Sequence, residues 1–375
     1  MKPHRKILRH FTLTVEGIIN FLLVLAFVTA LVAPYISPKT TILPAFFNLS
    51  YPLWYTLLIV FFLFYLLRRK WSFVGLYGIL ILLAIPYTMA YFPVRFASDS
   101  APQESETVKV ATYNVKSFRG VSKKGETAVR FINQLDADIV CLQEAIFDTN
   151  LSQNAKQLKK NFGKVYPYIH EHVDYDSHSQ GLVLLSKYPI EKHIPIRYPA
   201  EGNSSCSYIL KHHNGKSIMV VNNHMESYRL TQQDKQDIKG WIKREPLINI
   251  PKIYSGLKNK LGPKLKIRAF AAERVKCTVD SLSQRYAPKY SFVCGDMNDT
   301  PMSYSYNVIR SDMRDAYKDA GSGFGFTYNE RFFWFRIDHI FYKGNIKAFS
   351  SKVDEKKGIS DHNPLVAEFY LTSSD

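Results

Sequence analysis

The stretch SFVCGDMNDTP, residues 291–301, decides the fold of this chain. A short apolar run ends at a glycine, three close polar groups follow, and Pro301 prevents the run from continuing. Short apolar runs bounded by Gly and Pro are typical of buried strands. Because side chains alternate along a strand, Asp296 and Asn298 lie on the same side of it. We therefore expect a strand whose end delivers a carboxylate and an amide into a cleft, where they can hold a water and a phosphate oxygen.

Other strand-like runs end in polar groups in the same way. The alternating run VKVATYNV, residues 108–115, carries Asn114 at its end, and the apolar run at 137–142 stops before Glu144. A predicted hairpin further along the chain runs into His224. Helical patterns separate some of these strands, and this alternation is typical of α/β proteins whose sites lie at strand ends.

The C-terminal part of the chain adds three more polar groups. FRIDHIFY, residues 335–342, reads as a strand with Asp338 in its middle, whereas Asp361 and His362 fall in a turn before the last strand. Strands that repeatedly end in carboxylate, amide or imidazole carry desolvation penalties unless those groups meet at a metal or a ligand. We expect such a meeting point here.

The cysteines argue against a thiolate metal centre. The chain has four, Cys141, Cys206, Cys277 and Cys294, and none has the paired spacing of a zinc site. Cys141 and Cys294 lie in predicted core strands, where we expect buried thiols and no disulfide. The candidate metal ligands all offer oxygen, which favours a hard ion such as Mg²⁺ or Mn²⁺ and fits phosphoester hydrolysis.

The N-terminal quarter of the chain has a different composition and predicts a membrane anchor, residues 1–95, with three transmembrane helices. Each apolar segment is near the roughly 17 to 25 residues that a spanning helix needs. The three segments are at about 11–32, 51–67 and 71–92. Basic residues before the first segment and at 68–70 should stay in the cytoplasm. This topology predicts an integral protein of a bacterial-type inner membrane with its soluble domain on the extracytoplasmic side.

A polar linker, residues 96–107, precedes the predicted soluble domain at 108–375. The net charge of +17 divides into +8 for residues 1–95 and +9 for the remainder. A moderately basic domain suits an anionic partner, although solubility alone also explains it. Residues 226–266 are rich in lysine with interspersed apolar residues. They are either an amphipathic element that lies on a membrane surface or contacts a polyanion, or a solvated helical insertion.

Six segments, taken together, resemble the motifs of the endonuclease/exonuclease/phosphatase superfamily. They are, in chain order, ATYNV, CLQE, VNNHMES, GDMND, RIDHIF and SDHNPL. The resemblance extends from about Val108 to Leu371. It implies an α/β fold, a four-layer α/β sandwich of two packed sheets flanked by helices, preceded here by the three transmembrane helices. It also implies a site at one edge of the sandwich.

The resemblance implies a role for each of the polar groups. Glu144 matches the principal metal ligand of the family, with Asn114 and Asp361 in or near the metal shell. The implied cofactor is Mg²⁺ or Mn²⁺.

The remaining polar groups match catalytic positions of the family. His362 resembles the catalytic histidine, and Asp338 matches the acid that orients it. Asp296 matches the acid that aligns or deprotonates water, or that protonates the leaving group. Asn298 and His224 match residues that hold the phosphate oxygens.

The leading hypothesis is a membrane-anchored, divalent-metal-dependent phosphoester hydrolase, a nuclease-like phosphodiesterase. Its partners would be a phosphoester substrate, either nucleic acid or a phospholipid or its headgroup, and the lipid bilayer; no protein partner is predicted. One alternative is a lipid or headgroup phosphoesterase of the same fold. The other is a non-catalytic membrane receptor that binds a phosphate ligand.

Overall fold

The computed structural model describes the chain in nine stretches: 3–95, 105–122, 125–148, 150–173, 181–200, 203–228, 250–330, 333–355 and 358–372. The chain divides into two compact units, Met1–Thr88 with Met302–Tyr304 and Met89–Pro301 with Ser305–Asp375. Every strand of the described residues belongs to the second unit. The candidate site therefore has to be sought there.

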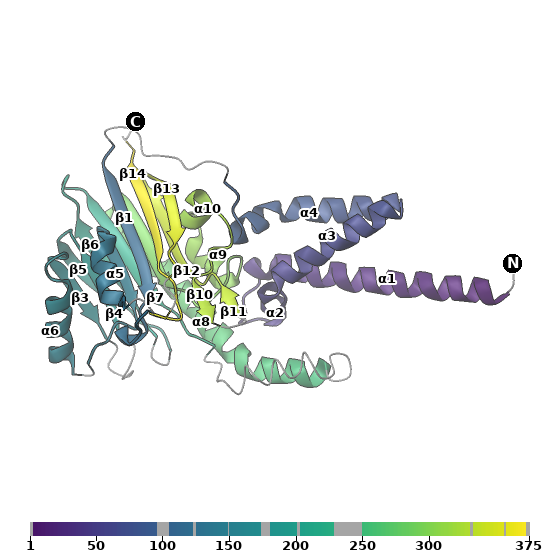
Figure 1. The fold of residues 1–375 in the computed structure, drawn as a ribbon, viewed down its shortest axis with the longest axis horizontal. Helices are drawn as coiled ribbons and strands as arrows, with labels where there is room; N and C mark the ends of the chain where they lie inside the picture. The colour runs from purple at the N-terminus through teal and green to yellow at the C-terminus, as the bar shows by residue number, and fades with distance from the viewer. Residues whose placement is uncertain are drawn as a thin grey trace. The chain divides into compact units, whose positions relative to one another are not determined.

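Two six-stranded sheets form the centre of the second unit (Figure 1). The first sheet consists, in spatial order, of β13 (Ile346–Val353), β14 (Leu365–Leu371), β1 (Thr107–Asn114), β2 (Ile139–Gln143), β4 (Leu182–Ser186) and β3 (Tyr168–His172). The second consists of β5 (Ile190–Ile196), β6 (Ser205–Lys211), β7 (Ser217–His224), β8 (Tyr290–Asp296), β12 (Asp338–Gly344) and β9 (Arg314–Asp315). A separate hairpin pairs β10 (Tyr328–Glu330) with β11 (Phe333–Phe335).

One central pair of strands in each sheet is parallel, β1 with β2 and β7 with β8. The other neighbours are antiparallel. Parallel partners end at the same edge of a sheet, so Asn114 lies opposite Gln143, and His224 lies opposite Asp296. The polar groups predicted at separate strand ends are thus delivered in pairs.

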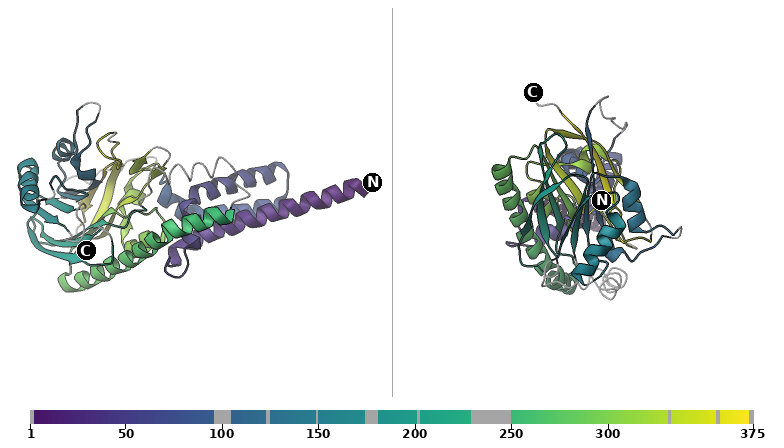
Figure 2. Two further views of the ribbon diagram at one scale, coloured as in Figure 1. Left: turned by 90° about the horizontal axis from the view of Figure 1, so that it is seen from below. Right: turned by 90° about the vertical axis from the view of Figure 1, so that its left-hand side faces the viewer.

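Apolar side chains fill the space between the sheets and cover both outer faces. The inner core contains Val110, Cys141, Val220 and Phe292, among other fully buried side chains. The outer face of the first sheet is covered by α5 (Ala128–Leu135) and α6 (Leu151–Phe162), and that of the second by α8 (Ile250–Tyr286) and α9 (Tyr304–Arg310). Figure 2 shows α8, in green, on the opposite side of the sheets from the teal helices α5 and α6. The domain is the expected α/β sandwich of four layers.

The short elements of the second unit connect these layers. They are the single turn η2 (Lys116–Phe118) after β1 and the helix α10 (Ala316–Ala320) after β9.

The four cysteines are free, and the expected burial of Cys141 and Cys294 is confirmed.

The first unit is helical. Its elements are α1 (Pro3–Val32), η1 (Ala33–Tyr35), α2 (Leu43–Leu49), α3 (Tyr51–Leu67) and α4 (Trp71–Tyr91), whose last residues belong to the second unit. Two helices of the described residues, Leu13–Tyr35 and Trp71–Tyr91, are long and apolar enough to cross a membrane. The pair Leu43–Leu49 and Tyr51–Leu67, bent by 69°, would make a third span if it counts as one. Three spans therefore stay a prediction.

Polar groups inside this helical unit are paired with one another. The Asn20 amide donates to the Tyr65 hydroxyl and accepts from the Tyr77 hydroxyl, both at 2.5 Å. Nearby, Lys70 forms an ion pair of 2.6 Å with Glu16. Since buried polar groups are stable when they are hydrogen-bonded, these contacts explain how an apolar helix tolerates an amide and a carboxylate.

Several boundaries differ from the expectations. Residues 335–342 are not one strand, because β11 ends at Phe335 and β12 begins at Asp338. Asp338 is therefore the first residue of a strand and not a residue from its middle. The basic segment at 226–266 is helical from Ile250, as the first part of α8, while 229–249, which include Trp241, lie outside the described residues. So do 96–104 of the predicted linker.

Buried His339, next to Asp338 in β12, should lower the stability of the domain at acidic pH. Its Nε2 donates to the Asp299 carbonyl and its Nδ1 accepts from Arg336, each at 3.1 Å, so both nitrogens are used by the neutral ring. Burial and the Arg336 charge, which outweigh the opposing influence of Asp315, lower the pKa of His339 from 6.5 to about 4. The unfolded chain therefore binds more protons than the folded one between these pH values.

We expect His339→Gln to flatten the pH dependence of stability in that window. A single such histidine lowers the free energy of unfolding by about 1.4 kcal/mol per pH unit as the pH falls from 6.5 towards 4. Chemical unfolding of the wild type and the variant across this range measures the difference in slope. His213→Gln, at an exposed position, is the control and should leave the slope unchanged. Equal slopes for all three proteins would contradict the expectation.

Candidate active site

The polar groups named from the sequence meet at the edge where the two sheets end. They come from the ends of β1, β7 and β8, from the start of β12, and from the loops that follow β2 and β8 and precede β14: Asn114, His224, Asp296, Asp338, Glu144, Asn298, Asp361 and His362. A connected series of contacts joins seven of the eight, and Lys116 links the eighth, Asp361, to Asn114. Their convergence was expected from the pattern of polar strand ends.

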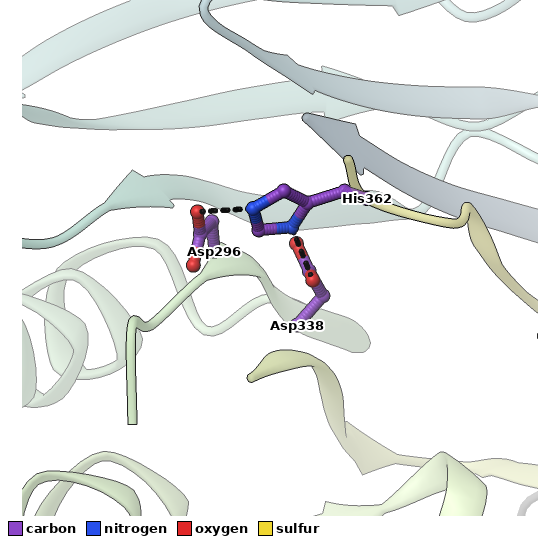
Figure 3. A group of neighbouring side chains, drawn as sticks. All are labelled: Asp296, Asp338 and His362. Carbon is purple, nitrogen blue, oxygen red and sulfur yellow. Dashed lines mark hydrogen bonds and ion pairs between the residues drawn. The ribbon is translucent and has the colours of Figure 1, made fainter. Parts of the chain in front are cut away.

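His362 lies between two buried carboxylates (Figure 3). Its Nδ1 donates a hydrogen bond of 2.8 Å to Asp338, and its Nε2 lies 3.6 Å from Asp296. All three side chains are at most about 6% exposed. Asp296 and Asp338 are direct partners in the antiparallel pairing of β8 and β12, and the ring of His362 contacts both side chains.

The electrostatics of this group follow from that arrangement. Burial by itself lowers the pKa of His362, but the Asp338 and Asp296 carboxylates outweigh it and raise the pKa to about 10. Burial raises the pKa of Asp296 to about 6, against the opposing effect of His362. The ring is therefore held in its protonated form, with its second N–H directed at Asp296.

Asp296 is the centre of the contacts. Its Oδ2 accepts a hydrogen bond of 3.1 Å from Asn114, which belongs to the other sheet, and lies 3.7 Å from Nε2 of His224. Its Oδ1 accepts a hydrogen bond of 2.9 Å from the backbone N–H of Asn298, two residues further along the chain. Gly295 allows β7 to lie close beside β8, since a Cβ there would lie 2.0 Å from the carbonyl oxygen of Asn223. The glycine before the aspartate is thus a packing requirement.

A second set of oxygen atoms lies beside this group. Asn114 donates to Glu144 at 3.2 Å, and Glu144 lies 3.8 Å from His224. Glu144 is one-quarter exposed, with a backbone φ of 50°. Asp361 forms an ion pair of 2.8 Å with the Lys116 ammonium.

The Lys116 ammonium is a cation that this edge of the site already holds. Burial lowers its pKa, but the Asp361 and Glu144 carboxylates outweigh burial and raise it. Both carboxylates among the predicted metal ligands therefore raise the pKa of one cationic group. Carboxylate and amide oxygens around a positive charge are a donor set suited to a hard divalent ion.

Some residues that hold the site in place were not named from the sequence. Thr327 Oγ1 accepts from the backbone N–H groups of Ile337 and Asp338, each at 3.0 Å. The Tyr328 ring lies 5.1 Å from that of His362, edge on, and the same two residues form an isolated β-bridge. Ser360 accepts from the His362 backbone N–H and donates to the Asn114 carbonyl. Of these residues, only Ser360 could be found from the local sequence, because a serine two residues before His362 can accept a hydrogen bond from its backbone N–H.

A family model described as the Endonuclease/Exonuclease/phosphatase family matches residues 111–362. The chain belongs to this family. Its members are phosphoester hydrolases, both nucleases and phosphatases, and they generally depend on a divalent metal. A second model, described as a domain of unknown function, matches residues 10–91. A comparison with curated proteins gave no match.

Several solved structures are similar to this chain. A family protein from Bacteroides thetaiotaomicron is 15% identical, with 72% of this chain and 100% of the other covered, at a TM-score of 0.50. A family protein from Bacteroides vulgatus is 18% identical, with 71% of this chain and 99% of the other covered, at a TM-score of 0.49. The catalytic domain of human Nocturnin, with bound sulfate, is 17% identical, with 71% of this chain and 95% of the other covered, at a TM-score of 0.48.

The position of His362 between two acids makes a prediction about its protonation. In Asp338→Asn the pKa of His362 should fall by about 1 to 3 units, because a carboxylate at hydrogen-bond distance is replaced by a neutral amide. Titration of the histidine ring by NMR measures this pKa. Asp319→Asn, a substitution in α10 that removes a carboxylate elsewhere in the domain, is the control. An unchanged pKa in Asp338→Asn would show that Asp338 does not hold the charged ring.

Proposed function

We propose that this protein is a membrane-anchored, divalent-metal-dependent phosphoester hydrolase, in which residues 1–95 anchor a catalytic domain at 108–375. The observation that carries the proposal is the imidazole of His362 between two buried carboxylates, with amide and carboxylate oxygens beside it. Membership of a family of phosphoester hydrolases supports the same chemistry. Helices apolar enough to cross a membrane support the anchor.

The metal would be held by Glu144, Asn114 and Asp361, whose donor atoms are all oxygens. The fit is supported by the Lys116 ammonium, which already pairs with Asp361 and feels the charge of Glu144. When bound there, Mg²⁺ or Mn²⁺ would neutralise phosphate charge and polarise the ester. The group of Asp296, Asp338 and His362 has ligand atoms within 4.8 Å of one another, but its ring is already hydrogen-bonded to one carboxylate. We assign that group to proton and charge chemistry.

The chain's own residues would act on the phosphate as follows. His362, oriented by Asp338, would place its positive charge beside a phosphate oxygen and stabilise the charge of the transition state. Asp296 would align the attacking water and accept its proton. The water oxygen then bonds to phosphorus as the ester P–O bond breaks, and the leaving oxygen takes up a proton from solvent. Asn298 and His224 would hold the remaining phosphate oxygens.

The substrate is proposed to be a phosphodiester, as in a nuclease. A lipid or headgroup phosphoester is the second candidate, since the exposed aromatic side chains of this domain do not separate the two classes. Trp334, in the β10–β11 hairpin that carries Tyr328, is 57% exposed, and Phe324 is 50% exposed. Exposed aromatic rings suit either base stacking or a lipid interface. The extracytoplasmic side of a bacterial-type inner membrane is the proposed location, from the basic clusters of the anchor.

We expect Glu144→Ala and His362→Ala to remove phosphoester hydrolysis, with losses in kcat/KM on the order of 10² to 10⁴. Glu191→Ala and His213→Ala change the same residue types at exposed positions and should retain activity. Release of product from bis(p-nitrophenyl) phosphate in the presence of Mg²⁺ measures the rates. Undiminished activity in either site variant would defeat the proposal. Phosphate binding without turnover by the wild type would support the receptor alternative instead.

The substrate class follows from a comparison of two natural phosphodiesters. We expect the purified full chain to cleave plasmid DNA with Mg²⁺ and to lose this activity in a chelator, because the oxygen donor set needs its ion. Phospholipid vesicles serve as the competing substrate. Hydrolysis of the vesicles but not of DNA would reject the nuclease-like assignment and favour the lipid phosphoesterase.

A further inference from the structure

The largest fully buried side chain of the described residues is a charged one, Arg268 of α8. Burying a guanidinium is unfavourable unless it is paired and hydrogen-bonded, so its position requires a reason. Arg268 packs behind the loops that follow β7 and β8, which carry the proposed phosphate-binding residues. Its contacts show what it holds.

Arg268 ties these two loops together. Its Nε lies 3.3 Å from a carboxylate oxygen of Asp299, in the loop after β8. Its Nη1 donates to the carbonyl of Asn298 in the same loop, and to the carbonyl of Glu226 in the loop after β7 at 3.1 Å. The guanidinium also lies over the ring of Tyr228, 4.2 Å from its centroid. One planar cation therefore fixes the backbone of both loops.

The held backbone in turn sets the direction of the Asn298 side chain. Asn298 has a φ of 50°, a left-handed conformation that needs external support in most residues. Its backbone N–H donates to Asp296, and its side-chain amide donates to the Met225 carbonyl at 2.9 Å. An amide NH₂ has two hydrogens, so the second is the one that a phosphate oxygen would accept.

We propose that Arg268 is a positioning residue, which fixes the loops after β7 and β8 so that the Asn298 amide meets the substrate phosphate. The inference rests on the proposed function, because it assigns a purpose to Asn298 in that reaction. Arg268 contacts neither substrate nor metal and acts through the Asn298 backbone. A lysine at this position keeps the charge but cannot reach the carbonyls of Asn298 and Glu226 and the carboxylate of Asp299 at once.

A double-mutant cycle separates positioning from general stability. Four proteins are compared as full chains: the wild type, Arg268→Lys, Asn298→Gly and the double variant. Glycine is chosen because it removes the amide and accepts the φ of 50°. We expect Arg268→Lys to lower kcat/KM for bis(p-nitrophenyl) phosphate by about 10- to 100-fold, the loss typical of a misplaced binding group.

The same substitution should lower activity much less in the Asn298→Gly background, by under about 3-fold, because the group that it positions is already absent. An equal loss in both backgrounds would overturn the inference and leave Arg268 a structural residue. Arg274→Lys, an exposed change on the same helix, is the matched control. Thermal unfolding of each protein shows whether it is folded. Should Arg268→Lys fail to fold, Asp299→Asn breaks the ion pair from the other side and replaces it in the cycle.

Failure of the proposed function gives a different result. If the wild type hydrolyses no phosphoester, that function is wrong, and the cycle is then measured as affinity for inorganic phosphate by calorimetry. Weaker binding in Arg268→Lys, with no further loss in the double variant relative to Asn298→Gly, supports the positioning role without turnover. Additive losses, or unchanged affinity, reject it.

Discussion

The site depends on two carboxylates that the sheet forces together. Asp296 ends β8 and Asp338 begins β12, and the antiparallel register sets them directly opposite each other. Like charges in such a pair repel, and burial removes the water that would screen them. His362, between the two side chains, supplies the compensating positive charge. The paired strands and the imidazole thus form one unit, in which the ring contacts both acids.

This unit also explains why two sheets are needed. Asp296 and Asp338 belong to the second sheet, whereas Asn114, which donates to Asp296, ends a strand of the first. A deeper contact repeats the connection, since Gln143 of the first sheet donates to Asn222 of the second at 2.7 Å. Buried polar groups that pair across the interface fix its register, as well as avoiding the desolvation penalty. The site is therefore positioned by the packing of the sandwich as a whole.

The sequence was sufficient to predict the convergence of the polar strand ends but not the contacts that support them. Alternating apolar runs reveal strands such as β1 and β8, since side-chain burial follows the period of two. Asp338 was expected within a strand, because FRIDHIFY gives no sign of the break before it. Thr327 and Arg268 were not found, because a lone hydroxyl in a loop and an arginine in a helix pattern look solvent-exposed. Their partners are distant in sequence, and only the tertiary structure brings them together.

The burial of Arg268 shows how the outer layer contributes to the site. A helix that only covered a sheet would need an apolar face, and α8 has one in Ala272 and Val275. One turn before this face, the helix instead carries a cation into the layer, where Asp299 neutralises it. Replacing such a pair with apolar residues often leaves stability unchanged, so stability alone does not account for it. The cation also fixes direction, because its Nη1 donates to one carbonyl in the loop after β7 and to one in the loop after β8. The sheets thus position the two acids, and α8 positions the loops that follow β7 and β8.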